Sequence, residues 1–356
     1  MKGCLNPYII GETAYIHEGD FNYLRKMIDA IAKIGLNAVK FHILLEPESY
    51  FQKKHPLVKE IGKWMLTRKE WDRLIERAAM KGLDIIMLCD DVASVEFIFG
   101  RYPPVNAIEI HATGLNDIFL LEAASKFKGR VMLGVGGSTV DEIEYAVNYL
   151  RTRGKEDLVL MYGFQSYPTD YKEINLSKMA KLRDIFHLPV GYADHTAQDD
   201  PNNEIISVMA AAMGFNILEK HFALVQGEER VDYHAGVGPA AMSRIKSLME
   251  IALQVYGTGK IDMSVPEKNY GNTGPMKKAL VARKRIKKGE TISLDNVWFK
   301  RTTEETPVRQ MELVKMLGRK ASRDIKEDEL IDFGKIEYEF RKHDASSFTH
   351  VKGKRR

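Results

Sequence analysis

The sequence predicts a (β/α)8 barrel followed by a small β-rich domain. Eight short apolar runs recur along the first 222 residues, and segments of helical period lie between most of them. The runs are apolar in the middle and bounded by Gly, Pro or Asn, as expected of parallel strands covered on both faces. The first run lacks the Gly-rich fingerprint that usually follows the first strand of a doubly wound dinucleotide-binding sheet. Eight strand–helix units within about 250 residues therefore favour the barrel.

In chain order, the predicted strands are residues 8–13, 37–43, 84–89, 107–112, 130–135, 158–163, 189–194 and 215–222. The predicted helices are residues 20–34, 68–82, 115–128, 139–152, 175–186, 202–213 and 239–256, with a short segment around 94–100 after the third strand. Two helix starts carry a capping box, in which Thr67 pairs with Glu70 and Thr139 with Glu142.

The chain changes character beyond the barrel, which is predicted over residues 1–256. Residues 257–277 are rich in Gly, Pro and Asn and lack periodicity, which indicates a linker. The β-rich domain is predicted over residues 278–340. Within it, residues 282–292 and 321–331 align without gaps at an offset of 39, which predicts two similar hairpin-like units. The basic and polar residues 341–356 are expected to be disordered.

The composition is ordinary for a globular protein, with 44% hydrophobic and 29% charged residues among 356. The 53 basic and 49 acidic residues give a net charge of +4, which is too slight to indicate a nucleic-acid partner. Two cysteines cannot form a disulfide framework. Polar residues interrupt the N-terminal apolar stretch, and no apolar run approaches the roughly 20 residues of a membrane span. We expect a cytoplasmic enzyme without a membrane partner.

Polar side chains gather at the predicted strand ends, where the active site of a barrel lies. Lys40 and His42 have an even spacing, so both side chains should face the barrel mouth. The same ends of other strands carry His17, Glu18, Asp90, Asp91, Glu109, His111, Gln165, Tyr167, Asp194, His195, Glu219 and His221.

Two features of this set suggest chemistry, each with an alternative. His195 and His221 end adjacent strands, so their imidazoles could converge on Zn²⁺, Mn²⁺ or Fe²⁺, or else hydrogen-bond a substrate. A buried lysine is unfavourable unless it is paired or functional. Lys40 could therefore bind a phosphate or carboxylate, form a Schiff base, or make a structural ion pair with Glu12 or Glu219.

Two further features allow weaker inferences. Glu18 precedes a predicted helix, so it is either a carboxylate that satisfies the helix dipole or a general base or sugar ligand. The Gly-rich loop 134–139 follows a strand and opens a helix. Such a loop can hold an anion on its backbone N–H groups, although many loops of this kind bind nothing.

Five stretches resemble the N-acetylneuraminate (sialic acid) synthase family: residues 16–20 (Ile-His-Glu-Gly-Asp), 37–41 (Asn-Ala-Val-Lys-Phe), 166–169 (Ser-Tyr-Pro-Thr), 191–196 (Gly-Tyr-Ala-Asp-His-Thr) and 217–222 (Ile-Leu-Glu-Lys-His-Phe). The terminal domain, with Lys-Lys-Gly-Glu at 287–290 and Lys-Arg at 300–301, resembles the antifreeze-like (SAF) domain that follows the barrel in that family. The resemblance covers about residues 6–340.

The resemblance implies condensation of phosphoenolpyruvate with an N-acylated hexosamine, such as N-acetylmannosamine, to give a nonulosonic acid. His195 and His221 match the two metal ligands, usually for Mn²⁺, which would polarise the aldehyde of the open-chain sugar. Glu18 and Asp232 match carboxylates that hold the sugar, and Glu219 matches a carboxylate near the metal and the water.

Further roles follow from the same resemblance. Lys40 matches a donor-binding lysine. Arg301 matches an arginine that the SAF domain of one subunit offers to its partner's active site, which implies a domain-swapped homodimer. The full set of residues assigned to substrate binding is His42, Gln165, Tyr167, Asp194 and Arg301.

The sequence departs from the family at several ligand positions. The fourth strand usually carries Lys, Ser and Glu where this chain has Glu109, Ala112 and Gly114. The other departures are His42 in place of Gln, Gln165 in place of Asn, and Gly134 and Ala193 in place of Ser. Most side chains that would hold a donor phosphate are therefore absent, and a carboxylate in place of a cation opposes a dianion.

Three hypotheses remain. The chain is a nonulosonic acid synthase, or a metal-dependent aldolase, lyase or other transferase with a different, phosphate-free donor, or a non-catalytic protein that binds a glycan or partner. The retained His195 and His221 favour the two enzymes over the binding protein. The lost phosphate ligands favour the second enzyme over the first.

Overall fold

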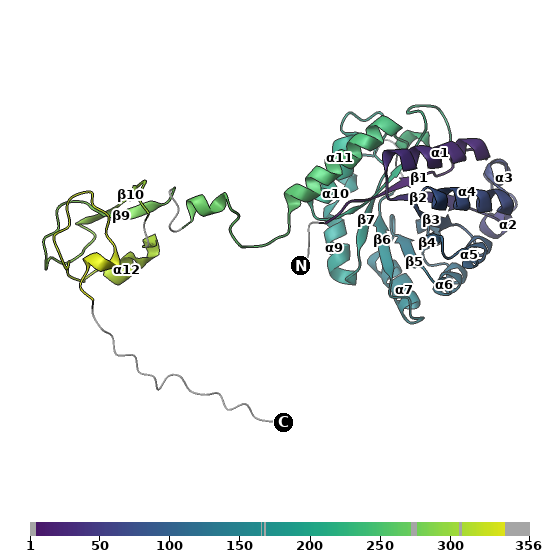
Figure 1. Cartoon of the computed structure of the whole chain (residues 1–356). Helices are drawn as coiled ribbons and strands as arrows, with labels where there is room; N and C mark the ends of the chain where they lie inside the picture. Colours follow the sequence, from purple (N-terminus) through teal and green to yellow (C-terminus); the bar gives the residue numbers. More distant parts are fainter. Residues whose placement is uncertain (1–4, 165, 167–168, 272–275, 306–307, 339–356) are drawn as a thin grey trace, which may run out of the picture. The chain divides into compact units, whose positions relative to one another are not determined.

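The computed structural model describes residues 5–338 apart from 165, 167–168, 272–275 and 306–307 (Figure 1). Eight parallel strands close into a barrel in chain order. They are β1 (Tyr8–Glu12), β2 (Ala38–Ile43), β3 (Asp84–Cys89), β4 (Val105–Ile110), β5 (Arg130–Gly134), β6 (Leu158–Tyr162), β7 (Val190–Asp194) and β8 (Ile217–His221). Pairing of β1 with β8 closes the ring, which confirms the predicted fold class.

Helices surround the barrel, as Figure 1 shows. Those that follow a strand and cover it are α1 (Phe21–Ile34), α4 (Arg68–Met80), α5 (Val92–Phe99), α6 (Ile118–Ser125), α7 (Val140–Arg151), α9 (Ser177–Phe186), α10 (Asn203–Ala212) and α11 (Pro239–Tyr256). Short helices lie in the loops: α2 (Pro47–Tyr50), α3 (Val58–Trp64), α8 (Tyr171–Ile174), and the 3-10 turns η1 (Ala112–Gly114) and η2 (Tyr233–Ala235). No helix of the described chain is long and apolar enough to cross a membrane.

Side-chain alternation along the strands divides the barrel interior into an apolar and a polar layer. Ile10, Ala38, Ala107 and Ile217 belong to an apolar cluster inside the barrel. Two residues further along each strand, and hence on the same face, stand Glu12, Lys40, Glu109 and Glu219. The opposite faces of the strands pack under the helices in the main hydrophobic core. The apolar layer therefore supports a polar layer at the carboxyl ends of the strands.

The predicted elements agree with the structure except at some boundaries. All eight strands are present, but β4 begins at Val105, two residues before the predicted start. The helix expected over 115–128 is shorter and begins at Ile118, because the Asp117 side chain accepts from the N–H groups of Phe119 and Leu120 and caps it there. Both predicted capping boxes are confirmed. The loop helices α2, α3 and α8 are too short to give a periodic signal.

The chain divides into two compact units after Gly259, within the predicted linker 257–277. The second unit contains β9 (Lys278–Ala282), which pairs antiparallel with β10 (Val297–Arg301). It also holds α12 (Leu313–Met316) and the turns η3 (Glu267–Tyr270), η4 (Gln310–Glu312) and η5 (Phe333–Lys335). Its core consists mainly of aliphatic side chains. The predicted tail 341–356 lies outside the described residues.

The two segments of the predicted repeat contact each other at equivalent positions in the second unit. Ile286 and Ile325, which are 39 residues apart, exchange both backbone hydrogen bonds, at 2.9 and 2.8 Å. Arg285 also pairs with Asp324, again at the repeat offset, with 2.7 Å between nitrogen and oxygen. The equivalent halves therefore pack against each other rather than lying apart as two independent hairpins.

Candidate active site

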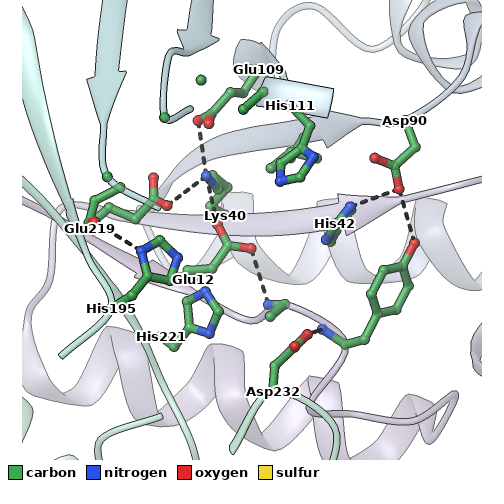
Figure 2. Close-up of a pocket in the computed structure, with 18 of the residues that line it drawn as sticks. Glu12, Lys40, His42, Asp90, Glu109, His111, His195, Glu219, His221 and Asp232 are labelled. Carbon is green, nitrogen blue, oxygen red and sulfur yellow. Dashed lines mark hydrogen bonds and ion pairs between the residues drawn. The ribbon is translucent and has the colours of Figure 1, made fainter. Parts of the chain in front are cut away.

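A cavity of about 470 Å³ opens at the carboxyl ends of the barrel strands (Figure 2). Strand ends contribute charged and imidazole side chains: Glu12, Lys40, His42, Asp90, Glu109, His111, His195, Glu219 and His221. Tyr50, Phe51 and Trp64, from the segment that contains α2 and α3, add an aromatic wall. The even spacing that predicted a common direction for Lys40 and His42 is confirmed, since both line this cavity, and Glu109 and His111 line it as well.

Lys40 lies at the centre of the polar layer, within ion-pair distance of three carboxylates. Its Nζ is 2.8 Å from Glu12 Oε2, 3.0 Å from Glu109 Oε2 and 2.8 Å from Glu219 Oε1. All four side chains are almost completely buried. Burial by itself lowers the pKa of Lys40, but Glu109 and Glu219 outweigh it and the pKa is raised. Lys40 is therefore held as an ammonium ion, which has no lone pair for Schiff-base formation.

Three carboxylates surround one positive charge, and the pKa of Glu109 changes as a result. Burial raises the pKa of Glu109 to about 7; Lys40 opposes this rise, and Glu219 adds to it. The ion pairs with Glu12 and Glu219, one of the sequence-based alternatives for Lys40, are present. The pair with Glu109 was not foreseen. Glu109 stands two strands from Lys40, so the contact forms across the barrel interior rather than between neighbours in the sheet.

His195 and His221 lie side by side at the ends of β7 and β8, with 5.0 Å between ring centroids. His195 Nδ1 is 3.0 Å from the carbonyl oxygen of Ala193, so a proton on Nδ1 would leave Nε2 as a free acceptor. His221 Nδ1 is buried without a hydrogen-bond partner. Burial lowers the pKa of both imidazoles, that of His221 strongly.

Neutral imidazoles with free nitrogen atoms suit a divalent transition metal, and this pair fits part of such a site. Among the described residues, no three His, Cys, Asp or Glu side chains are grouped so as to hold an ion. His195 and His221 would therefore supply two ligands, and oxygen atoms of substrate or water would supply the rest. Glu219 Oε2, which is buried and lacks a hydrogen-bond partner, belongs to the same part of the cavity.

A second pair of imidazoles lines another part of the cavity, apart from the first pair in Figure 2. His42 Nε2 lies 2.7 Å from Asp90 Oδ2, and the Tyr15 hydroxyl donates to the same oxygen at 3.3 Å. His111 lies beside His42, with 5.7 Å between ring centroids. Burial lowers the pKa of His111 to about 4, so this ring is neutral near pH 7. Asp90 is buried and lies within ion-pair distance of His42.

Asp194, predicted to bind substrate, is not among the residues that line the cavity. Its Oδ2 is 2.8 Å from Lys220 Nζ, and Thr196 and Tyr192 donate to Oδ1 at 2.6 and 3.1 Å. Ser207 donates to Oδ2 as well. Burial raises the pKa of Asp194, but Lys220 and the hydroxyl groups outweigh it and lower the pKa to about 2. The pair lies outside the cavity and joins the ends of β7 and β8.

Glu18 and Asp232, both predicted to hold the sugar, have different positions. Asp232 lines the cavity, and its Oδ2 accepts from the Tyr15 N–H at 3.4 Å. Glu18 does not line it; its Oε1 accepts from the Val231 N–H at 2.9 Å, next to Asp232 in the chain. Both backbones adopt positive φ, at 48° for Glu18 and 58° for Asp232. Glu18 therefore holds the loop that carries Asp232.

Three other predicted site residues do not belong to the described part of the barrel unit. Gln165 and Tyr167 lie outside the described residues. Arg301 lies on β10 in the second unit, where it donates to the sulfur atom of Met276 at 3.0 Å. The aromatic wall, in contrast, was missed by sequence reasoning, because α2 and α3 are short and irregular.

Comparison with known proteins places this site in a family. The sequence matches the NeuB family over residues 27–261 and the SAF domain over residues 277–337. The chain belongs to the NeuB family. An uncharacterized protein of Methanocaldococcus jannaschii is 29% identical over 91% of this chain and 93% of its own. The N,N'-diacetyllegionaminic acid synthase of Campylobacter jejuni is also 29% identical, over 91% of this chain and 98% of its own.

A solved structure supports the same assignment. The N-acetylneuraminic acid synthetase of Leptospira borgpetersenii, in complex with citrate, has a TM-score of 0.69 and 26% identity. The match covers 75% of this chain and 90% of that one. The resemblance drawn from the five sequence stretches is thereby confirmed, together with the SAF domain at the end of the chain.

Proposed function

We propose that this NeuB-family chain forms a carbon–carbon bond between a three-carbon donor of the phosphoenolpyruvate or pyruvate class and the open-chain aldehyde of an N-acylated hexosamine. The product is a nonulosonic acid. The observation that carries the proposal is the cavity at the carboxyl ends of the barrel strands, lined by two neutral imidazoles of adjacent strands. Relatives whose names describe synthases of legionaminic and N-acetylneuraminic acids support the product class.

The acceptor side of the cavity is the side of β7 and β8. His195 and His221 would hold a divalent metal, for which we propose Mn²⁺, and the bound ion would polarise the aldehyde carbonyl. Asp232, which lines the same cavity, can accept hydrogen bonds from sugar hydroxyls. Glu18 fixes the position of Asp232 through the Val231 N–H, so its effect on the sugar is indirect. Tyr167 and Gln165 remain proposed substrate contacts.

Arg301 gives the second unit a role in the proposed function. We propose a domain-swapped homodimer in which this arginine reaches the active site of the partner subunit. Arg301 is exposed on β10 within its own unit, as an intersubunit contact requires. Removal of residues 278–340 should then weaken acceptor binding while leaving a folded barrel, and an unchanged Michaelis constant for the sugar would refute this role.

A metal-dependent aldolase or lyase with a phosphate-free donor is the second candidate. The ion pair between Lys40 and Glu109 favours it, because this lysine is occupied by carboxylates. Both candidates share the acceptor, the new carbon–carbon bond and the product skeleton. They differ only in the donor.

The proposed function is tested by product formation. The full-length protein with Mn²⁺ is incubated with N-acetylmannosamine or other N-acylated hexosamines, and with either phosphoenolpyruvate or pyruvate. We expect mass spectrometry to detect a nonulosonic acid with at least one sugar. Absence of any such product with both donors, across the sugar panel, would contradict the proposed function.

A further inference from the structure

The charge of the cavity determines whether a donor with a phosphate group can bind. This inference rests on the proposed function. The described residues that line the cavity include five carboxylates, Glu12, Asp90, Glu109, Glu219 and Asp232, but one lysine and no arginine. That lysine, Lys40, already lies within 3.0 Å of three of the carboxylates. Among the described side chains that line the cavity, no lysine or arginine is left free to meet a donor phosphate.

The helix that follows the loop after β5 does not replace the missing cations. Gly136 packs against the backbone of the next strand, since a Cβ there would lie 1.8 Å from the Gly163 carbonyl oxygen. At the start of α7, Thr139 and Glu142 form a capping box in which the Glu142 carboxylate accepts from the Thr139 N–H at 2.7 Å. This carboxylate already occupies the helix N-terminus, where an anion would otherwise bind.

Like charges repel strongly in a buried site, so the cavity disfavours a phosphate dianion. A three-carbon donor without phosphate is a 2-oxo acid, and it carries a single negative charge. The enol is then not supplied ready-made, and a base must generate it by removing a proton from C3. One side chain of the cavity is arranged to act as such a base, since His42 lines the cavity and its Nε2 lies 2.7 Å from the buried Asp90 carboxylate.

We propose that the donor is an unphosphorylated 2-oxo acid of the pyruvate class, and that His42, oriented by Asp90, is the base that activates it. Asp90 also accepts from the Tyr15 hydroxyl, so the carboxylate that orients His42 is itself fixed in place. The Asp90 carboxylate lies against Nε2 of His42, which leaves Nδ1 of the imidazole as the nitrogen that would take the proton. Lys40 does not offer an enamine route, because three carboxylates hold it as an ammonium ion.

The proposed reaction balances without another reactant. The C3–H bond of the 2-oxo acid breaks, its proton moves to the free nitrogen of His42, and the electron pair forms the enolate. The C3 atom then bonds to the aldehyde carbon, and the resulting alkoxide takes a proton back from His42. No group leaves, and the product is a 4-hydroxy-2-oxo acid with the skeleton of a nonulosonic acid. The same groups would cleave that product in reverse.

The test measures the donor half-reaction without any sugar. Full-length protein, with and without Mn²⁺, is incubated with pyruvate in D2O, and the C3 methyl signal is followed by proton NMR. We expect catalysed exchange of the methyl protons for deuterium. The His42→Asn variant should lower the exchange rate by about 100-fold or more, which is the usual contribution of a general base. The Asp90→Asn variant should lower it in the same direction.

His187→Asn is the matched control. His187 is exposed at the end of α9 and has φ of 54°, a conformation that Asn adopts readily, so the control should exchange at the wild-type rate. Thermal unfolding of each variant shows whether it is folded. Loss of exchange in folded His42→Asn, but not in His187→Asn, supports the assignment of the base. Exchange at the wild-type rate in folded His42→Asn would overturn it.

The donor itself is decided with wild-type protein. Micromolar binding of phosphoenolpyruvate in a calorimeter, or phosphate release when a sugar is added, would overturn the phosphate-free donor while leaving the proposed function intact. Exchange of pyruvate protons without condensation onto any hexosamine would keep the donor and sink the proposed function. Absence of exchange in the wild-type protein would overturn the donor assignment.

Discussion

Two buried lysines of the barrel show opposite charge balances. Lys220 pairs with Asp194 and lies outside the cavity, so one cation meets one carboxylate. Lys40 lies in the cavity and meets three. Burial lowers the pKa of Lys220, whereas Glu109 and Glu219 reverse that effect at Lys40 and raise its pKa. The charges of Lys220 and Asp194 neutralise each other. The Lys40 cluster has two more carboxylates than cations, and these two negative charges are stabilised only if protons or further cations bind.

The Lys220–Asp194 pair is a structural ion pair, whereas the Lys40 cluster is part of the candidate active site. The carboxylate of Asp194 is completely satisfied by Lys220 and neighbouring hydroxyl groups, which leaves it nothing to offer a ligand. In the Lys40 cluster, Glu219 Oε2 remains without a hydrogen-bond partner. A buried acceptor without a partner is unfavourable, so its presence beside the cavity indicates that a proton, ligand or ion completes the site.

Replacement of Lys40 should have the largest effect. Lys40→Met leaves three buried carboxylates without their cation, so we expect a loss of unfolding free energy greater than the about 3–5 kcal/mol typical of breaking one buried pair. Denaturant unfolding near pH 7 measures it. A loss below about 1 kcal/mol would mean that the carboxylates are already largely protonated and that the cluster carries no surplus charge.

The Lys220→Met variant tests the other buried lysine of the comparison. It leaves Asp194 alone, and we expect a loss of about 3–5 kcal/mol in the free energy of unfolding. Because the pKa of Asp194 in the folded protein is lowered to about 2, its stabilising contribution is present above the unfolded value of 3.8 and fades as the pH falls toward 2. The difference between wild type and variant should therefore shrink in that range. A difference independent of pH there would contradict the ion pair.

Glu109 should show the reverse pH dependence with a smaller effect. Its pKa is raised from 4.5 to about 7, so the bound proton favours the folded state at low pH, and this advantage is lost as the pH rises from 4.5 through about 7. Glu109→Gln keeps an uncharged side chain and should lack that loss. Wild type should thus lose stability relative to the variant between pH of about 5 and about 8, as measured by urea unfolding. Parallel curves would show that Glu109 is ionised throughout.

The barrel was predictable because its signals are local and repeated. Apolar runs of strand length, capping residues such as Thr67 and Thr139, and the 39-residue repeat each specify structure from nearby residues. The loop helices α2 and α3 gave no such signal, since neither is long enough to show a period. The aromatic wall that they place on the cavity was therefore missing from the sequence-based site.

The contents of the site were only partly predictable, for a geometrical reason. The sequence placed Lys40, His195 and His221 at strand ends, and the family resemblance marked Glu109 as a departure. That Glu109 pairs with Lys40 depends on the closed barrel, whose interior brings side chains 69 residues apart in the sequence to 3.0 Å. Neither the hydrophobic pattern of the sequence nor the family resemblance predicts this contact.

We expect the smallest change in stability for replacement of His195, whose imidazole is neutral. His195→Ala removes an imidazole that lines the cavity and makes one weak backbone contact, so we expect a loss of about 1 kcal/mol or less. Binding of Mn²⁺ should nevertheless weaken by more than about 100-fold, because loss of a direct ligand exceeds the effect of losing an outer-shell partner. Calorimetric titration with Mn²⁺ measures this, with His187→Asn as the control. Unchanged stoichiometric binding would remove the metal from the proposed mechanism and leave the imidazole pair as hydrogen-bonding groups for the sugar.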